Sequence, residues 1–374
     1  MTFEELRAAF PSAQKCIHLN HAGTSPIARP VAEAVEATLA DLMSENSLRA
    51  YINQFQQQGT LRAALGRMMN VAPETLGFVR NTSHGLAIAA DALPLDPGDN
   101  IVLPAIEYPA NVYPWMAQAH RGVEVRRVPP RADNLVDEQD LFAACDAQTR
   151  VLAVSWVQWG TGQRLDLARL GAFCREKGIV FAVDLVQGLG ALRPDLSLVD
   201  VAASGCHKWL LAPGGLGVLY VRPEVLATLR PVNIGWNSVT DSTDWERIHF
   251  DLRPGTGRFE EGTFNLLGTA ALGASVALLE QVGFDAVERR VLALADHAHA
   301  RLAERGCRVV PLAEPDRRSG IVAFRHPTQP NDAVLAALSA RGVLAAVRGG
   351  NVRFAPHAYN TEEDVDRAVA ALPD

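Results

Sequence analysis

The sequence has no excess of positive charge. It carries 35 lysine and arginine residues against 42 aspartate and glutamate residues, a formal net charge of −7 over 374 residues. Nucleic acids and anionic membranes are bound by concentrated positive charge, which this composition does not supply. We therefore expect no nucleic-acid partner and no membrane partner, and a small-molecule ligand is favoured.

Long apolar runs and paired cysteines are also missing. No uninterrupted apolar run approaches the ~18 residues needed to cross a bilayer, and the opening MTFEELRAAF contains acidic residues and no apolar run of signal-peptide length. The five cysteines are odd in number and widely scattered, which fits neither a disulfide framework nor a zinc site with paired cysteines. We expect a cytoplasmic protein without a metal site.

What the sequence does contain is a repeated alternation of short apolar runs with amphipathic segments, beginning near residue 76. Strand, helix, strand in repetition predicts right-handed crossovers and a mostly parallel sheet covered on both faces. A chain of 374 residues exceeds the roughly 250–300 residues that one core usually serves. We predict a large α/β domain over residues 17–257 and a smaller α+β domain formed by residues 1–16 and 258–374.

Ligands of open α/β sheets bind beyond the carboxyl ends of the strands, so residues at those ends are candidates for a site. After the apolar run TLGFV, Thr82 and Ser83 open a predicted helix whose free N–H groups could hold an anion. Both would serve equally well as helix caps. After NIVLPAI, Tyr108 could stack on a flat ring, although taken alone it fits a core or turn tyrosine better.

Two further strand ends carry an acid and a lysine. Asp184 follows IVFAV, where an ionised carboxylate is costly without a partner, so it is a candidate to pair with a protonated ring nitrogen. Gln187 could reach the same ligand, or it is an ordinary turn residue. Lys208 follows VDVAAS and precedes GGLG, which favours a confined amine that attacks an aldehyde over the usual solvated lysine.

An anion cup, an aromatic platform, a carboxylate and a lysine are the four parts that pyridoxal 5'-phosphate requires. The phosphate, ring, ring nitrogen and aldehyde of that cofactor must each be held. The combination predicts this cofactor, with Lys208 as the lysine that forms the Schiff base with its aldehyde.

Six motifs follow one another along nearly the whole chain: GFVRNTSHG, EYPANVYPW, AVDLVQ, HKWLLAPGGLG, FEEGTFN and RFAPHAYNTEEDVD. In this order they resemble the class V aminotransferase family of fold-type I pyridoxal-phosphate enzymes. The resemblance implies a seven-stranded, mostly parallel sheet and a smaller C-terminal domain. It also implies roles for the following residues: Thr82 and Ser83 bind the phosphate, Tyr108 stacks on the ring, Asp184 pairs with the pyridine nitrogen, Gln187 contacts the phenolic oxygen, His207 assists beside Lys208, and Arg353 holds the substrate carboxylate.

The same resemblance extends to a second subunit and to the substrate pocket. Thr263 matches a residue that reaches the phosphate of the neighbouring subunit, which implies a homodimer with shared active sites. His21, Trp159 and Trp236 are implied to contact the substrate.

Departures from the family pattern narrow the function. Desulfurases of this family carry a nucleophilic cysteine on a mobile loop before the arginine, whereas this chain reads VLAAVRGGNVRF there. Gly205 replaces a phosphate-binding serine of the desulfurase branch. NHAGTSP, EYPANVYPW and GWNSV look closer to the epimerase and C–S lyase branch.

The sequence thus predicts an enzyme that acts on an α-amino acid, either as an aminotransferase or as a lyase that eliminates a β-substituent. An amino-acid epimerase stays open, because removal of the Cα proton by Lys208 precedes all three outcomes. A nicotinamide dehydrogenase would need a strand-to-helix GxGxxG, which is missing. A cofactor-free scaffold would keep Asp184 and Lys208 as buried charges without a ligand, which is unfavourable.

Overall fold

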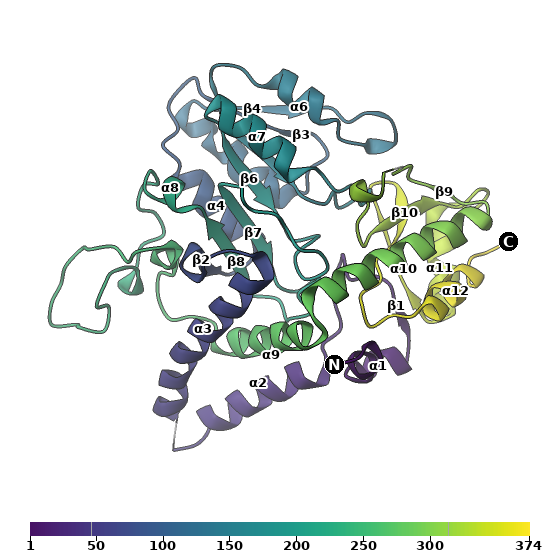
Figure 1. Ribbon diagram of the computed structural model, residues 1–374, viewed down its shortest axis with the longest axis horizontal. Coiled ribbons are helices and arrows are strands. Elements are labelled where there is room, and N and C mark those ends of the chain that lie inside the picture. Colours follow the sequence, from purple (N-terminus) through teal and green to yellow (C-terminus); the bar gives the residue numbers. More distant parts are fainter. Residues whose placement is uncertain (46, 313) are drawn as a thin grey trace.

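The computed structural model describes residues 1–45, 47–312 and 314–374. Its centre is a seven-stranded sheet in the order β2–β8–β7–β6–β5–β3–β4 (Figure 1). All neighbouring strands are parallel except β8, which is antiparallel to both β2 and β7. The predicted mostly parallel sheet is confirmed. The strands are β2 (Leu76–Val79), β3 (Asn100–Pro104), β4 (Glu124–Val128), β5 (Thr149–Ser155), β6 (Val180–Asp184), β7 (Val201–Gly205) and β8 (Gly217–Val221).

Apolar residues on both faces of the strands explain why this sheet is covered on both sides. In β3, Ile101 and Leu103 pack into one core while Val102 packs into the other, as expected when successive side chains of a strand alternate between faces. One face is covered by α4 (Thr82–Ala92) and α5 (Tyr113–Met116), and the other by α6 (Glu138–Ala144) and α7 (Leu167–Lys177).

A second, antiparallel sheet forms the C-terminal part in the order β12–β13–β10–β9. Phe324, Val352 and Phe354 of this sheet form a core with the helices that pack on it. Thr361 caps the last helix, and its hydroxyl accepts the Asp364 N–H. The elements are β9 (Arg308–Val309), β10 (Val322–Arg325), β12 (Ala346–Arg348), β13 (Asn351–Phe354), α10 (Phe284–Glu304), α11 (Asn331–Ala340) and α12 (Glu362–Ala370).

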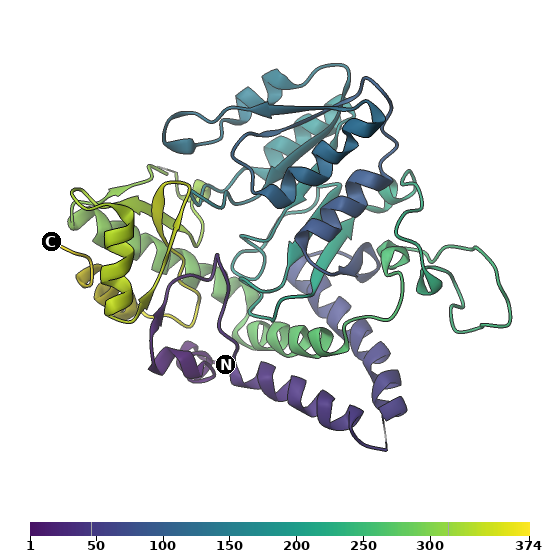
Figure 2. The ribbon, with the colours of Figure 1, turned by 180° about the vertical axis from the view of Figure 1, so that it is seen from behind.

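The N-terminal segment links the two parts and runs beside the C-terminal sheet (Figure 2). Its strand β1 (Ile17–His18) pairs in parallel with β11 (Val343–Leu344), and Ile17 belongs to the core of the smaller sheet. Residues beyond 258 also pack on the large part, because α9 lies against α2 and α3. Packing therefore crosses both expected boundaries, and the division at 17 and 258 stays a prediction. The remaining helices are α1 (Phe3–Ala8), α2 (Arg29–Leu42), α3 (Ser47–Met69), α8 (Pro223–Leu226) and α9 (Leu266–Val282).

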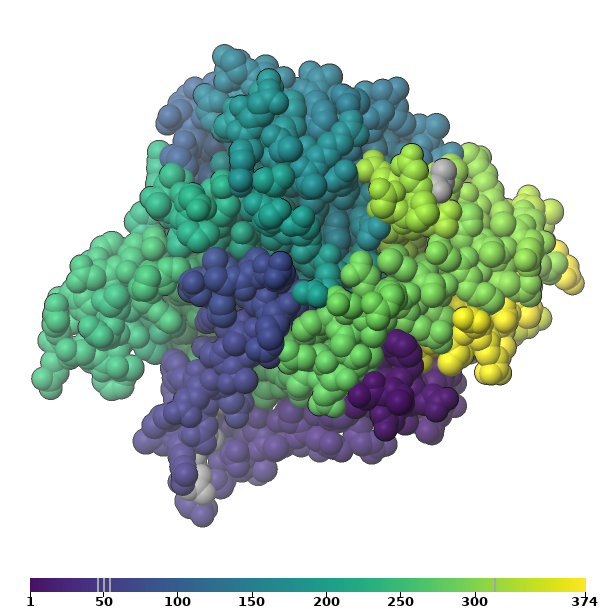
Figure 3. Space-filling model, in the orientation of Figure 1, coloured from purple at the N-terminus to yellow at the C-terminus, as the bar shows by residue number. Residues whose placement is uncertain are grey.

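An irregular stretch between α8 and α9 projects from the body at the left of Figure 3. It contains exposed apolar side chains, among them Trp245 and Ile248. Within the described residues, no single helix is long and apolar enough to cross a membrane. A stretch of that length and composition arises only when α9 and α10 are joined across their 81° bend.

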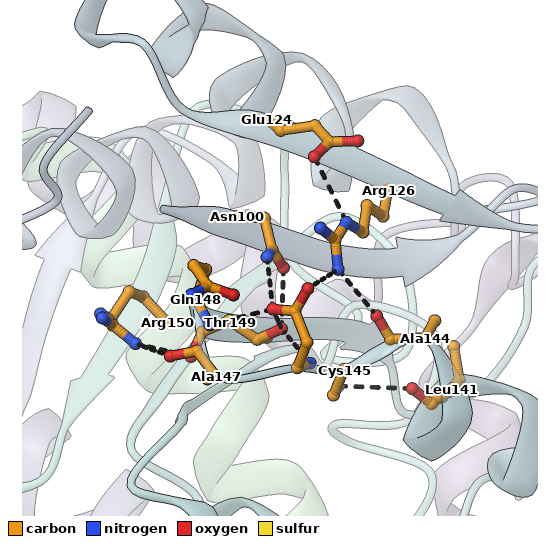
Figure 4. A network of polar contacts seen from close by, with 11 residues as sticks. Asn100, Glu124, Arg126, Leu141, Ala144, Cys145, Ala147, Gln148, Thr149 and Arg150 are labelled. Carbon is orange, nitrogen blue, oxygen red and sulfur yellow. Dashed lines mark hydrogen bonds and ion pairs between the residues drawn. The ribbon is translucent and has the colours of Figure 1, made fainter. Parts of the chain in front are cut away.

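Polar residues join the amino ends of the neighbouring strands β3 and β5, beside the point where the register of this pair shifts between Asn100 and Ile101 (Figure 4). Asn100 donates to an Asp146 carboxylate oxygen at 2.8 Å and accepts from the Thr149 hydroxyl at 2.8 Å. Arg126 on β4 pairs with the same aspartate at 2.5 Å. This cluster joins the strands at their amino ends. The carboxyl ends, where ligands of α/β sheets bind, lie on the opposite side of the sheet.

Candidate active site

The carboxyl ends of the large sheet and one edge of the small sheet enclose a cavity of about 270 Å³. Eight of the residues predicted from sequence line it together: Thr82, Ser83, Tyr108, Trp159, Gln187, His207, Lys208 and Arg353. They come from six separate segments of the chain. Parallel strands bring their carboxyl ends to one edge of a sheet, which is why residues far apart in sequence meet here.

Lys208 lies just beyond β7 with only 8% of its surface exposed. Its backbone carbonyl accepts the Ser25 hydroxyl at 2.6 Å, which fixes the turn that carries it. Its Nζ lies 5.5 Å from the centre of the Tyr108 ring and makes no hydrogen bond within the described part of the chain. Burial lowers the pKa of this amine, the Asp184 carboxylate opposes the shift, and the Arg353 guanidinium adds to it. The amine is confined and available for reaction.

Asp184 ends β6 beneath the cavity, with 2% of its surface exposed. One carboxylate oxygen accepts the Val186 N–H at 2.8 Å, and Oδ2 has no partner among the described residues. Burial raises the pKa of Asp184, while the Val186 N–H and the Lys208 charge oppose the rise. A buried carboxylate oxygen without a donor is unfavourable, and the protonated ring nitrogen of pyridoxal phosphate would supply one. The residues present fit that cofactor.

The amino end of helix α4 offers a site for the cofactor phosphate. Asn81 caps the helix by accepting the His84 N–H at 2.9 Å, and Thr82 accepts the Gly205 N–H at 2.8 Å. The Thr82 hydroxyl therefore keeps its own proton to donate, and the exposed Ser83 hydroxyl lies beside it. Free N–H groups at a helix start favour an anion.

Gly205, which stands in place of a serine, is explained by the crowding at this point. A Cβ atom there would lie 3.2 Å from both the Thr82 hydroxyl and the His207 Nδ1. Glycine therefore allows the close hydrogen bond to Thr82. His207 lies at the rim, and burial together with the Lys208 charge lowers its pKa.

Gln187 is held by two protein contacts beneath the cavity. Its amide nitrogen donates to the Ala22 carbonyl at 3.0 Å, and its oxygen accepts the Trp209 indole N–H at 3.1 Å. A side-chain amide has two N–H bonds, so one is left to donate to a cofactor oxygen. The predicted contact with the phenolic oxygen stays a prediction that this geometry permits.

Arg353 is 1% exposed and faces the cavity from β13. Its Nη1 donates to the Trp159 carbonyl at 2.5 Å and its Nη2 to Asn20 at 3.4 Å, whereas Nε is buried without a partner in the described part of the chain. Burial, followed by the charge of Arg348, lowers the pKa of Arg353 to about 9. A buried guanidinium with a donor to spare is suited to a carboxylate.

Besides the buried Asp184, three predicted residues are absent from the cavity lining. His21 is fully buried, with its ring nitrogens bonded to the Ala355 carbonyl at 2.8 Å and the Tyr359 hydroxyl at 3.0 Å, so Ala22 and Gly23 line the cavity in its place. Trp236 is 43% exposed and packs near Gly262. Thr263 lies in a second cavity with Arg80 and Asn265. His21 and Trp236 do not line the cavity of this chain, and their contact with substrate stays a prediction.

Two residues of the site were missed by the sequence analysis. Glu107, which precedes Tyr108, is buried and accepts from the Ser155 N–H at 2.7 Å, the Ser155 hydroxyl, and Gln158 at 2.8 Å. Burial raises its pKa, and these hydrogen bonds oppose the rise. An acid directly after an apolar strand, the same signal that identifies Asp184, could have found it. Arg348 also lines the cavity.

Comparisons with known proteins agree with this geometry. The sequence pattern of the Aminotransferase class-V family matches residues 17–368. A probable cysteine desulfurase of Methanothermobacter thermautotrophicus is 26% identical over 98% of this chain and 96% of its own. The isopenicillin N epimerase of Streptomyces clavuligerus is 30% identical over 99% of this chain and 97% of its own.

Two solved structures of C-DES share the fold. A mutant with glycine covalently linked to the PLP cofactor superposes with a TM-score of 0.90 at 26% identity, covering 97% of this chain and 98% of that one. The complex of the cystine C–S lyase C-DES with its product cysteine persulfide gives a TM-score of 0.88 at 25% identity, covering 96% and 98%. The chain belongs to the class V aminotransferase family and is an enzyme that uses pyridoxal phosphate.

Proposed function

We propose that this enzyme is a β-elimination lyase that cleaves the bond between the β-carbon of an α-amino acid and a sulfur substituent. The observation that carries the proposal is a cofactor cavity without a thiol. None of the five cysteines lines it. The structural similarity to the cystine C–S lyase C-DES supports the same reaction class.

The positions of the cysteines argue against a persulfide route. Cys206 is nearest to Lys208 in sequence, yet it is fully buried and burial raises the pKa of its thiol. The segment before Arg353, where desulfurases are expected to carry their cysteine, is the β12–β13 hairpin with Gly349 and Gly350 at its turn. A two-residue turn leaves no mobile loop to deliver a thiol.

Each part of the proposed site has a defined task. When bound, pyridoxal phosphate supplies an electron sink for negative charge at the substrate Cα. Asp184 would hold its ring nitrogen, and the start of α4 would hold its phosphate. Arg353 would orient the substrate carboxylate, and the Lys208 amine would accept the Cα proton, because burial favours its neutral form.

The overall reaction balances with water as the second reactant. The Cα–H and Cβ–S bonds break, the proton passes to Lys208, and the electron pair of the Cβ–S bond leaves with sulfur. The substituent departs as a thiol, and hydrolysis of the three-carbon remainder yields pyruvate and ammonium. No oxidant or reductant is required.

Epimerisation is the second candidate, because the 30% identical relative is an isopenicillin N epimerase. Both reactions begin with loss of the Cα proton, so the same residues would serve either one. The holoenzyme should be mixed with cystine, S-substituted cysteines, alanine and glutamate. We expect pyruvate and ammonia in equal amounts from the cysteine derivatives. Pyridoxamine phosphate with an oxo acid, or inversion at Cα without pyruvate, would refute the lyase.

We also propose a homodimer with shared active sites. Thr263 is exposed and lies outside the Lys208 cavity of its own chain, where only a second subunit could use it for cofactor binding. This is consistent with the role implied by the family motif.

A further inference from the structure

The cavity contains a second arginine that the proposed reaction does not use. Arg348 ends β12 and lines the cavity with Lys208 and Arg353. In the described part of the chain it forms no ion pair, and its one hydrogen bond runs from Nη1 to the neighbouring Val347 carbonyl at 2.8 Å. No aspartate or glutamate belongs to the cavity lining. A positive charge therefore stands at the mouth without a counter-charge from the protein.

The register of the hairpin places the two arginines on one face. Arg348 lies opposite Asn351 and Ala346 lies opposite Arg353 in the β12–β13 pair. Residues directly opposite each other share a face, and alternate residues of one strand do as well. Arg348 and Arg353 therefore point to the same side, while Val352 points into the core of the small sheet.

The turn and its contact make this placement rigid. Gly349 and Gly350 have φ values of 56° and 78°, which a two-residue hairpin turn requires and which favour glycine. A Cβ atom on Gly349 would lie 3.3 Å from the Gly160 Cα, so the tip of the hairpin is seated on the segment that follows Trp159. A one-residue slip would turn Arg348 into the core, which its charge opposes.

The cofactor phosphate and the substrate α-carboxylate would account for two anionic groups in the cavity, and Arg348 offers a position for a third. The start of α4 accounts for the cofactor phosphate and Arg353 for the substrate α-carboxylate. Arg348 then has no anionic group to pair with, although its positive charge affects Arg353 and Lys208. After burial, which is the main cause, Arg348 contributes to the lowered pKa of both Arg353 and Lys208. A third anionic group would relieve this repulsion.

We propose that Arg348 selects α-amino acids whose side chain carries a second anionic group. This inference rests on the proposed function, because it takes the substrate to be an α-amino acid held by Arg353. An exposed guanidinium at the mouth would contact the far end of the side chain and leave the bonds at Cα and Cβ to Lys208.

The test compares two substrates of the same shape that differ in charge. S-Carboxymethylcysteine and its amide, S-carbamoylmethylcysteine, release leaving groups of nearly equal size. A charge-assisted hydrogen bond should favour the acid by about 10- to 100-fold in kcat/KM. The preference should decrease with added salt, because Arg348 is exposed.

Variants distinguish a loss of selectivity at Arg348 from a loss of activity on all substrates. Arg348→Gln should reduce the acid-to-amide ratio to about one, with most of the loss on the acid, and Arg348→Lys should keep part of the preference. The control is Arg289→Gln, an exposed arginine on α10 outside the cavity. A wild-type ratio near one, or an equal loss on both substrates in Arg348→Gln, would overturn the proposal.

A binding measurement distinguishes this failure from failure of the lyase proposal. Aspartate against asparagine, and glutamate against glutamine, can be titrated into the holoenzyme while the cofactor absorbance is followed. Tighter binding of the acids that is lost in Arg348→Gln would support the specificity even if no substrate is eliminated. Equal binding of acids and amides would contradict it even if elimination occurs.

Discussion

Replacing Arg353 by lysine tests whether the substrate is an α-amino acid. The arginine is 1% exposed, and Nη1 already donates to the Trp159 carbonyl at 2.5 Å. Nε is unpartnered among the described residues and Nη2 makes only a long contact of 3.4 Å with Asn20, so Nε and Nη2 would form the edge that binds a carboxylate. Lysine keeps the positive charge but cannot hold the Trp159 carbonyl and both oxygens of a carboxylate.

The magnitude follows from the number of hydrogen bonds lost. A bidentate contact has two charge-assisted bonds of roughly 1.5–3 kcal/mol each, and lysine keeps one at most. Arg353→Lys should therefore lower kcat/KM on the amino-acid substrate by roughly 10- to 100-fold, at about 1.4 kcal/mol for each factor of ten. Cofactor absorbance should be unchanged, because this side chain is assigned to substrate.

The control substrate is the matching amine without its carboxylate. Wild type should turn it over slowly, and Arg353→Lys should lose little further activity on it. An equal loss on both substrates would mean that the arginine acts only by joining the small sheet to the segment at Trp159. Near-normal kcat/KM on the amino acid would refute the carboxylate role.

The remaining predictions concern the thiols, the assembly, the cofactor and the stability. Replacing all five cysteines by serine or alanine should leave turnover largely intact, and a protein persulfide detected by mass spectrometry during turnover would contradict this. Mixing inactive Lys208→Ala and Thr263→Ala subunits should restore some activity through one intact hybrid site; no recovery after confirmed subunit exchange would place Thr263 outside the partner's site. Asp184→Asn should weaken cofactor retention by roughly 10- to 100-fold in equilibrium dialysis, because a charge-assisted hydrogen bond is lost, and unchanged retention would remove its assignment to the ring nitrogen. Burial lowers the pKa of His357 from 6.5 to about 4. Between these two pH values the folded protein binds fewer protons than the unfolded chain. The free energy of unfolding is therefore unaffected by His357 above pH 6.5 and falls by up to about 3 kcal/mol as the pH drops towards 4. His357→Gln should flatten this dependence in denaturant titrations, and an unchanged slope would show that other groups cause it.

Local patterns in the sequence determined the fold class and the main parts of the site. Short apolar runs separated by amphipathic segments predict a parallel sheet, and the carboxyl ends of parallel strands meet at one edge. For that reason the sequence alone groups Asp184, Lys208 and Thr82 at one site. In NVRF, alternation along the strand places Arg353 on the face opposite Val352 and Phe354, which belong to the core of the small sheet, whereas Arg353 lines the cavity.

The tertiary structure alone decided which way His21 and Arg348 face. His21 turns from the cavity because its ring bonds to Ala355 and Tyr359, more than 300 positions away in the chain. Arg348 belongs to the cavity because a two-glycine turn sets its register and Gly160 seats the hairpin tip. Strand periodicity acts over neighbouring residues and can be read from sequence, whereas the direction of a loop side chain depends on partners that only the folded chain brings near.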